Sequence, residues 1–127
     1  MNCNILVVDD SKIIRTAIKK IARVAGVTDD RIHEAANGQE ALDVLEKVWI
    51  DLVLLDINMP IMDGETFVVE KSKRPEFADI AVFIVSTEAN EERLQRMKDL
   101  GVRGTLRKPF EPEDLCQVIA DVIGAKA

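Results

Sequence analysis

The chain of 127 residues, 47% of them hydrophobic and 31% charged, has the size and composition of one globular domain and leaves no room for a second. Its net charge of −6 disfavours direct binding to nucleic acid or to an anionic membrane surface. The longest apolar run, residues 80–85, is far shorter than the roughly 20 residues of a membrane span, and no basic region with a long apolar stretch opens the chain. We therefore expect a cytoplasmic protein that binds neither membranes nor nucleic acid directly.

Five short apolar runs predict the strands of a sheet. The first ends abruptly at two adjacent carboxylates, as a fully buried strand does where it reaches a polar edge. In chain order, the strands are predicted at residues 5–8, 32–35, 52–55, 81–85 and, more weakly, 104–106.

The segments between these runs carry apolar residues three and four positions apart, which predicts amphipathic helices. Ser11 is placed to cap the first helix, Gly26 and Gly101 are placed to end the first and the fourth, and Pro112 suits the first turn of the fifth. In chain order, the helices are predicted from Ser11 to Ala25, from Asn37 or Gly38 to Val48, from Asp63 or Gly64 to Arg74, across residues 94–100, and from Pro112 to Ile123.

The strict alternation of strands and helices predicts right-handed crossovers and a parallel sheet covered on both faces. Open sheets of this kind bind ligands outside the carboxyl ends of their strands. Side chains able to carry chemistry follow four of the strands directly, so we expect them at one edge of the sheet: Asp9 and Asp10, Asp56, Ser86 with Thr87, and Lys108.

These side chains form a set suited to phosphoryl transfer. Carboxylates gathered at one edge repel one another unless a cation compensates, and Mg²⁺ prefers oxygen ligands and readily shares a phosphate oxygen. Lys108 adds a positive charge, Ser86 adds a hydroxyl donor, and an aspartate can form a covalent acyl phosphate. Asp56, which follows the predicted central strand, is therefore the expected nucleophile of a Mg²⁺-dependent transfer.

Each of these residues also has an ordinary structural role when it is taken alone. An acid ahead of a helix can cap it, Asp63 with Gly64 is a common turn pair, and a lysine is usual on a surface. Their joint placement at successive strand ends is what indicates a site. His33 has no neighbouring ligand and is predicted to pack or to lie on the surface, while Cys3 and Cys116 are predicted to be reduced, half-buried packing residues.

Four motifs occur in a fixed order: LVVDDS at residues 6–11, LVLLDINMPIMDG at 52–64, VSTEA at 85–89 and KPF at 108–110. Together they give the chain a specific resemblance, over essentially its whole length, to the CheY-like receiver domain of two-component response regulators. The resemblance implies a flavodoxin-like α/β fold, a doubly wound five-stranded parallel sheet in the order 2-1-3-4-5 with five helices in three layers. It also implies one receiver domain over residues 1–127 without an output domain.

The resemblance assigns the phosphoacceptor and the metal ligands. Asp56 would accept a phosphoryl group from the phosphohistidine of a sensor histidine kinase or a histidine phosphotransfer protein. Asp10 and Asp56 would bind Mg²⁺ directly, together with the backbone carbonyl of Asn58, whereas Asp9 would act largely through water. A domain of this family is a signalling receiver that assists its own phosphorylation and dephosphorylation, so we do not expect an enzyme with a substrate of its own.

Other implied roles concern the groups around the phosphoacceptor. Ser86 would hydrogen-bond the phosphoryl oxygen and move inward, and Thr87 would leave access to the site open. Lys108 would pair with Asp56 before phosphorylation and with the phosphoryl group after it. The peptide bond between Lys108 and Pro109 is commonly cis in the family, a state that a bond to proline reaches at modest cost.

Two positions imply how long the signal lasts, and a third bears on how it is transmitted. Asn58 and Glu88 occupy the places that tune attack of water on the acyl phosphate, and this pair is similar to that of fast-resetting chemotaxis receivers. The resemblance therefore implies that half of the phosphoryl groups are lost within about a minute. Thr105 stands where many receivers have a switching Tyr or Phe, so output would depend on the loop after Ser86, or the domain would relay phosphate with little conformational output.

The partners expected from this reading are a histidine kinase or phosphotransfer protein and a downstream protein target. Between residues 93 and 108 the chain has six basic residues and one acid, which suggests either a mixed solvated surface or a docking face on the fourth helix, last strand and fifth helix. A hydrolase with an aspartyl-phosphate intermediate is the competing enzyme class, but Asn58 stands where such enzymes need a second aspartate. A scaffold without phosphorylation or a flavin-binding protein would share the fold.

Overall fold

A computed structural model describes residues 3–126, with the side chains of residues 125 and 126 excepted. Its centre is a five-stranded parallel sheet in the order β2-β1-β3-β4-β5, which confirms the expected topology. The strands are β1 (Ile5–Val8), β2 (Ile32–Ala35), β3 (Leu52–Leu55), β4 (Ala81–Ser86) and β5 (Gly104–Arg107).

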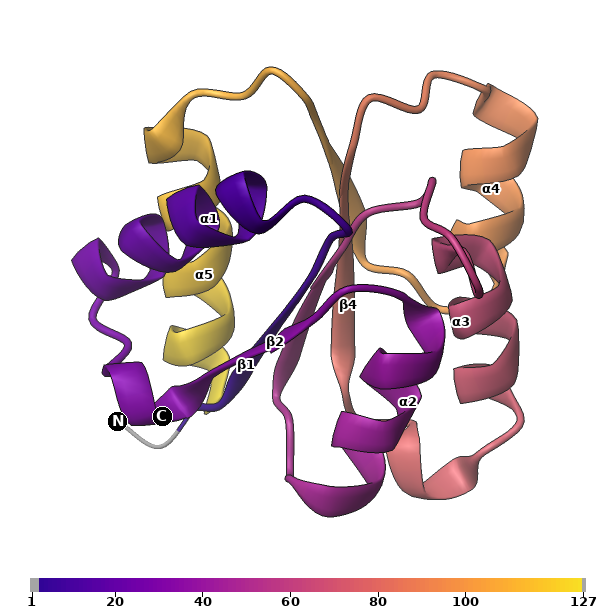
Figure 1. The fold of residues 1–127 in the computed structure, drawn as a ribbon, viewed down its shortest axis with the longest axis horizontal. Helices are drawn as coiled ribbons and strands as arrows, with labels where there is room; N and C mark the ends of the chain where they lie inside the picture. The colour runs from indigo at the N-terminus through magenta and orange to yellow at the C-terminus, as the bar shows by residue number, and fades with distance from the viewer. Residues whose placement is uncertain (1–2, 127) are drawn as a thin grey trace.

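Helices cover both faces of the sheet, giving the predicted three layers (Figure 1). Helices α1 and α5 pack on one face, and α2, α3 and α4 pack on the other. Two short 3₁₀ turns, Asp29–Arg31 and Pro75–Phe77, were not expected from the sequence. The helices are α1 (Lys12–Val24), α2 (Gly38–Lys47), α3 (Gly64–Ser72), α4 (Glu91–Asp99) and α5 (Pro112–Lys126).

The central strands are hydrophobic because both of their faces are covered. All four residues of β1 and all four of β3 are buried, whereas β5 alternates half-buried and exposed residues at the edge of the sheet. Side chains from these strands feed two separate apolar clusters, one on each face. The sheet is therefore held rigidly on both sides, and its carboxyl edge, at the top of Figure 1, is a stable platform.

Short polar side chains start the helices where the sequence suggests. Ser11, Asn37 and Asp63 each accept a hydrogen bond from a backbone N–H three residues ahead, at 3.3, 2.9 and 2.8 Å. The third helix ends at Ser72 and not at the predicted Arg74. Arg74 precedes a proline and has extended backbone angles, which a helix cannot continue through.

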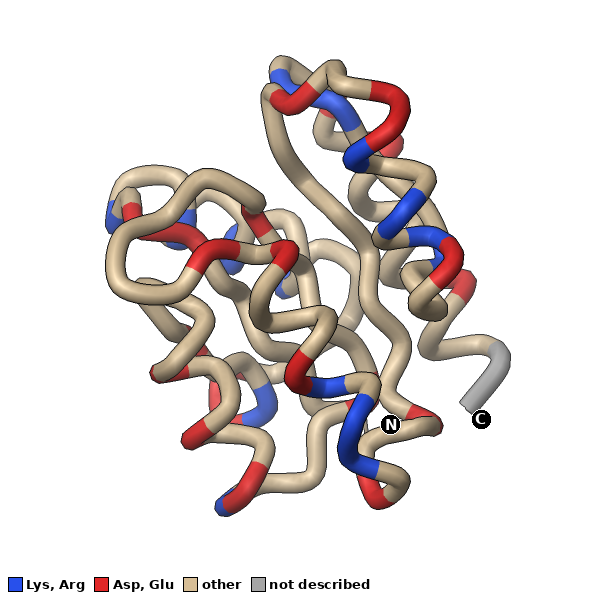
Figure 2. Tube along the Cα trace, turned by 90° about the vertical axis from the view of Figure 1, so that its right-hand side faces the viewer, with Lys and Arg blue, Asp and Glu red and all other residues tan. Residues whose placement is uncertain are grey.

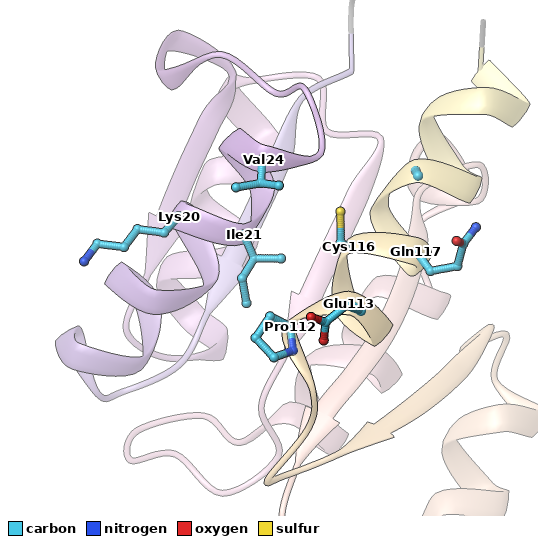
Figure 3. Close-up of a pocket in the computed structure, with 8 residues that line it drawn as sticks. Lys20, Ile21, Val24, Pro112, Glu113, Cys116 and Gln117 are labelled. Atoms are coloured by element: carbon cyan, nitrogen blue, oxygen red, sulfur yellow. The ribbon is translucent and has the colours of Figure 1, made fainter.

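Several other expectations concern single residues. His33 is half-buried in β2, and Cys3 is buried in the cluster beneath α1 and α5. Cys116 is half-buried and lines an apolar cavity of about 360 Å³ between α1 and α5, together with Ile21 and Pro112 (Figure 3). This cavity shares no residue with the carboxyl edge of the sheet. Among the described residues, no helix combines the length and the apolar character needed to cross a bilayer.

Two of the basic residues between positions 93 and 108 are paired with acids of the neighbouring helix, whereas Lys98, Arg103 and Arg107 are exposed. Arg93 and Arg96 form ion pairs with Glu65 of α3, and together they hold the pKa of Glu65 below its ordinary value, Arg96 having the larger effect. Burial and then the nearby charge of Arg103 lower the pKa of Lys71, also on α3. Figure 2 accordingly shows acidic and basic residues interspersed on this side of the molecule. The surface of α4 and β5 thus combines internally paired arginines with exposed basic residues, and a docking role for this face stays a prediction.

Candidate functional site

Three aspartates meet at the carboxyl edge of the sheet. Asp9 follows β1 and Asp56 follows β3, and the pairing of these strands continues one residue further through a 2.9 Å bond from Asp56 N–H to the carbonyl of Val8. Asp10 completes a group in which one carboxylate oxygen from each residue lies within 4.8 Å of the others. Asp9 and Asp56 are buried, whereas Asp10 is exposed to solvent. The group therefore has one open side.

Both carboxylate oxygens of Asp9 are already occupied. Its Oδ1 accepts a 2.9 Å hydrogen bond from the backbone N–H of Ser11, and its Oδ2 lies 2.7 Å from Nζ of Lys108. Its backbone carbonyl accepts a further hydrogen bond from Arg15 at 2.6 Å. Asp9 thus holds the ammonium group of Lys108 in place.

Lys108 is placed by the end of β5. Its backbone N–H donates to the carbonyl of Ser86 at 2.9 Å, and its peptide bond to Pro109 is cis, as the family resemblance implies. The ammonium nitrogen lies 2.7 Å from Asp9 Oδ2 but 3.8 Å from Asp56 Oδ2. The sequence-based expectation paired this lysine with Asp56, whereas the shorter contact in the structure is with Asp9.

Asp56 is the carboxylate whose ionised form is least favoured. Burial raises the pKa of Asp56 above its ordinary value, and the neighbouring charge of Asp9 raises it further. Lys108, a hydrogen bond with the Ser86 side chain, and the Ile57 backbone N–H, 2.8 Å from Oδ1, act in the opposite direction but do not cancel the effect. Its Oδ2 lies beyond hydrogen-bond distance of the lysine. An added cation would therefore stabilise the ionised form of this carboxylate.

Ser86 lies within β4, whereas the sequence pattern predicted it after this strand. It is the last residue of β4 and is fully buried, with its hydroxyl accepting a 3.2 Å bond from Glu88 N–H. The hydroxyl also makes a hydrogen bond with the Asp56 carboxylate. Thr87, the next residue, is exposed and leaves the site accessible.

Gly64 lies in close backbone packing that the sequence pattern did not reveal. Asp63 and Gly64 look like a common turn, but a Cβ on Gly64 would stand 2.3 Å from the carbonyl oxygen of Asp56 and 2.9 Å from Cα of Ile57. The Gly64 N–H also donates to the carbonyl of Ile57 at 2.8 Å. The glycine lets the start of α3 rest directly on the backbone of the phosphoacceptor candidate.

The other residues singled out from the sequence lie in two different parts of the structure. Asn58, two residues after Asp56, and Glu88, two residues after Ser86, share one neighbour, Arg93, which sequence reasoning placed only in the basic run. Thr105 is exposed on β5, where it lines a shallow groove with Leu94 of α4. The threonine therefore belongs to the α4–β5 surface and does not contact the acidic site.

The donor set fits a hard divalent cation. Carboxylate oxygens from Asp9, Asp10 and Asp56 are the ligand type that Mg²⁺ prefers, and the exposed position of Asp10 leaves space for the waters that Mg²⁺ retains. No histidine or cysteine belongs to the group that the described residues form. The raised pKa of Asp56 is the electrostatic mark of a site that benefits from a positive charge.

Comparison with known proteins agrees with this geometry. Residues 5–120 match the family described as the response regulator receiver domain. The chain belongs to this family. Sporulation initiation phosphotransferase F of Bacillus subtilis is 33% identical over 129 residues, covering 100% of this chain and 98% of the relative. A chemotaxis protein CheY homolog of Campylobacter jejuni is 33% identical over 121 residues, covering 94% and 92%.

The receiver domain also resembles solved structures closely. The chemotaxis response regulator CheY4 of Vibrio cholerae superposes with a TM-score of 0.85 at 33% identity, covering 96% of this chain and 99% of that one. Receiver domains of two-component response regulators are phosphorylation-based signalling proteins. The family therefore accounts for why acids, a lysine and a hydroxyl meet at this edge.

Proposed function

We propose that this receiver domain accepts a phosphoryl group on Asp56 from a phosphohistidine of a sensor histidine kinase or a histidine phosphotransfer protein. The observation that carries the proposal is the state of Asp56: a buried carboxylate beside two other acids, with a raised pKa and its Oδ2 3.8 Å from the nearest ammonium. Such a group gains more from a bound cation and a covalent partner than a fully paired structural aspartate does.

Asp10, Asp56 and the backbone carbonyl of Asn58 would hold Mg²⁺, which supplies positive charge to the transferring phosphoryl oxygens. Asp9 has both oxygens engaged by Ser11 and Lys108, so it would contribute through water and by fixing the lysine. The exposed carboxylate of Asp10 is free to turn toward a cation arriving from solvent.

The transfer itself needs little from the protein beyond placement and charge. Oδ2 of Asp56 forms a bond to phosphorus while the bond between phosphorus and the donor imidazole nitrogen breaks, and the imidazole leaves with the bonding electron pair. Lys108 would then pair with the new phosphoryl oxygens, and the Ser86 hydroxyl would donate to one of them. Lys108 Nζ lies 3.8 Å from Asp56 Oδ2 and the Ser86 hydroxyl hydrogen-bonds the Asp56 carboxylate, so neither has far to move.

Phosphorylation would alter a protein contact on the face formed by α4, β5 and α5, as in single-domain chemotaxis regulators. Thr105 is small and exposed there, so the loop that follows Ser86, and not a rotating aromatic ring, would transmit the change. The same observation favours a second function, onward transfer of the phosphoryl group in a relay with little conformational output. A relative named as a phosphotransferase is consistent with that alternative.

Incubation with acetyl phosphate and Mg²⁺, followed by intact-mass measurement, tests the phosphoacceptor. Wild type gains the mass of one phosphoryl group, and Asp56→Asn gains none. Asp10→Asn lowers the extent of labelling because a metal ligand is lost. An equal gain in wild type and Asp56→Asn would overturn the assignment. Acid quenching over time then measures the lifetime, for which we expect half of the label to disappear within about a minute.

A further inference from the structure

Arg93 joins three chain segments: the loop after β3, the start of α3 and the loop after β4. Its backbone N–H is fixed by the cap of α4, donating to Asn90 at 3.0 Å, and its side chain is only 20% exposed. Every nitrogen of the guanidinium has a partner, and four different side chains provide them. The contacts are Nε to Glu65 at 2.8 Å, Nη2 to Asp63 at 3.1 Å, and Nη1 to Asn58 at 3.2 Å and to Glu88 at 3.4 Å.

We propose that Arg93 is a positioning residue that prolongs the life of the phosphoryl group on Asp56. It does so by holding the side-chain oxygens of Asn58 and Glu88, so that they are not available to an attacking water. The inference rests on the proposed function, because it presupposes that Asp56 is phosphorylated and that these two positions govern hydrolysis.

Both carboxylate oxygens of Glu88 have hydrogen-bond partners. One carboxylate oxygen, Oε1, accepts a 3.1 Å hydrogen bond from the backbone N–H of Asn90, and the other, Oε2, pairs with Arg93. The carboxylate is only 16% exposed, so solvent competes weakly for it. Asn58 likewise offers its carbonyl oxygen to Arg93, which leaves its amide N–H₂ as the part of the side chain that can interact elsewhere.

Hydrolysis of the acyl phosphate is assisted by a proton acceptor for the attacking water, and the contacts with Arg93 engage two such acceptors. A water oxygen forms a bond to phosphorus as the bond from phosphorus to Asp56 breaks, the aspartate regains its electron pair, and the water proton passes to an acceptor. Asn58, two residues after Asp56, and Glu88, two residues after Ser86, both have side-chain acceptors, and the guanidinium engages both. Hydrolysis assisted by Glu88 must therefore compete with an ion pair that lowers the basicity of the carboxylate.

The acids of α3 hold the guanidinium in this position. Asp63 uses Oδ1 to cap α3 and Oδ2 to bind Arg93, while Glu65 shares its carboxylate between Arg93 and Arg96. Arg96 touches neither Asn58 nor Glu88 in the contacts that the described residues make, and its side chain is 57% exposed. Arg96 therefore provides a control with the same charge on the same helix.

The test compares Arg93→Met with Arg96→Met after phosphorylation by acetyl phosphate, using rapid acid quenching and intact-mass measurement. We expect Arg93→Met to lose its phosphoryl group about two- to fivefold faster than wild type, the factor that release of a partly exposed ion pair supplies. Arg96→Met should match wild type. Adding Glu88→Gln to Arg93→Met should remove most of the acceleration, because the freed acceptor is then absent.

The dependence on Glu88 separates positioning from a general structural effect. If Arg93→Met merely loosened the loop, the acyl phosphate would be hydrolysed faster with either Glu or Gln at position 88. Equal lifetimes for wild type and Arg93→Met overturn the inference, as does slower loss in Arg93→Met or equal acceleration in Arg96→Met. Absence of a mass gain in wild type would instead defeat the proposed function itself, so the two failures are distinguishable.

Discussion

Strand β3 carries a buried aspartate immediately before it and another immediately after it, and the two have opposite surroundings. Asp51, at the amino end, is 6% exposed, and Asp56, at the carboxyl end, is 9% exposed. Asp51 accepts hydrogen bonds from two neutral donors, the backbone N–H of Asn4 at 2.9 Å and the indole of Trp49 at 3.0 Å. Asp56 faces two other acids and a lysine that is closer to one of them.

The comparison shows that burial alone does not make a carboxylate reactive. Neutral donors that reach each oxygen of Asp51 produce a stable joint between the start of the chain and the sheet. Asp56 is buried without donors that fully offset the cost of burial, and the charge of Asp9 adds to that cost, so a metal ion can relieve the unfavourable negative charge. We therefore expect different functions for two residues of the same type and similar exposure, because their neighbours differ.

Matched substitutions should separate these functions completely. Asp56→Asn is expected to abolish phosphorylation by acetyl phosphate without lowering the free energy of unfolding, because an amide removes a repelled charge. Asp51→Asn is expected to retain phosphorylation but to lower the free energy of unfolding by about 1–3 kcal/mol, since an amide N–H₂ would face one of the two donors. Intact mass and urea unfolding measure the two effects.

Gly64 offers a second way to disturb the carboxyl end alone. Gly64→Ala places a methyl group against the backbone of Asp56, and we expect it to cost about 2–3 kcal/mol of stability and to reduce phosphorylation. Gly124→Ala, in α5, meets nothing within 4 Å and should raise stability by about 0.5–1 kcal/mol. Equal behaviour of the two variants in thermal unfolding would contradict the close packing of α3 on the phosphoacceptor.

The pH dependence of stability should carry the signature of Asp56. Because its pKa is raised above the ordinary 3.8, the folded state binds the proton more tightly than the unfolded chain. The resulting penalty is absent below the unfolded pKa and develops as the pH rises through the folded pKa. In buffer with a chelator, Asp56→Asn should therefore gain stability relative to wild type over that range, and the difference should then level off.

The complementary measurement is the effect of Mg²⁺ on the free energy of unfolding, at a pH above the range in which Asp56 titrates. Mg²⁺ should stabilise wild type by neutralising the acids and should stabilise Asp56→Asn less. A difference between the two proteins that is constant at every pH would show that Asp56 titrates normally.

A smaller effect is expected at Ile61, in the loop that follows Asp56. Within the described part of the chain, Ile61 is the non-glycine residue with a positive φ, +69°, and it is 86% exposed. A β-branched side chain is strained there, so Ile61→Asn should raise stability by about 1 kcal/mol. Ile13→Asn, at an equally exposed site in α1, should give no such gain in urea unfolding.

The carboxyl edge could be predicted from the sequence because parallel strands bring their ends together whatever the side chains do. Asp9, Asp56 and Lys108 each follow a strand, and this alone placed them near one another. The partner of the lysine could not be predicted, since a difference between 2.7 and 3.8 Å depends on how side chains pack.

Contacts between distant segments were the part that the sequence concealed. Arg93 meets residues 28 and 35 positions earlier in the chain, and no periodic pattern relates them. The role of Gly64 was missed for a similar reason, because its turn signal hides the approach of a helix to a strand end. Asp51 drew no attention because its donors are a backbone amide and an indole that only the fold brings to it.

The position of Trp49 has a practical consequence for experiments on this protein. It is the one tryptophan of the chain, half exposed and tied to Asp51 at the amino end of β3. The length of a buried strand separates the indole from Asp56, so its emission will follow denaturation faithfully yet stay unchanged when the aspartyl phosphate forms. An optical assay of signalling will need a fluorophore introduced at the opposite end.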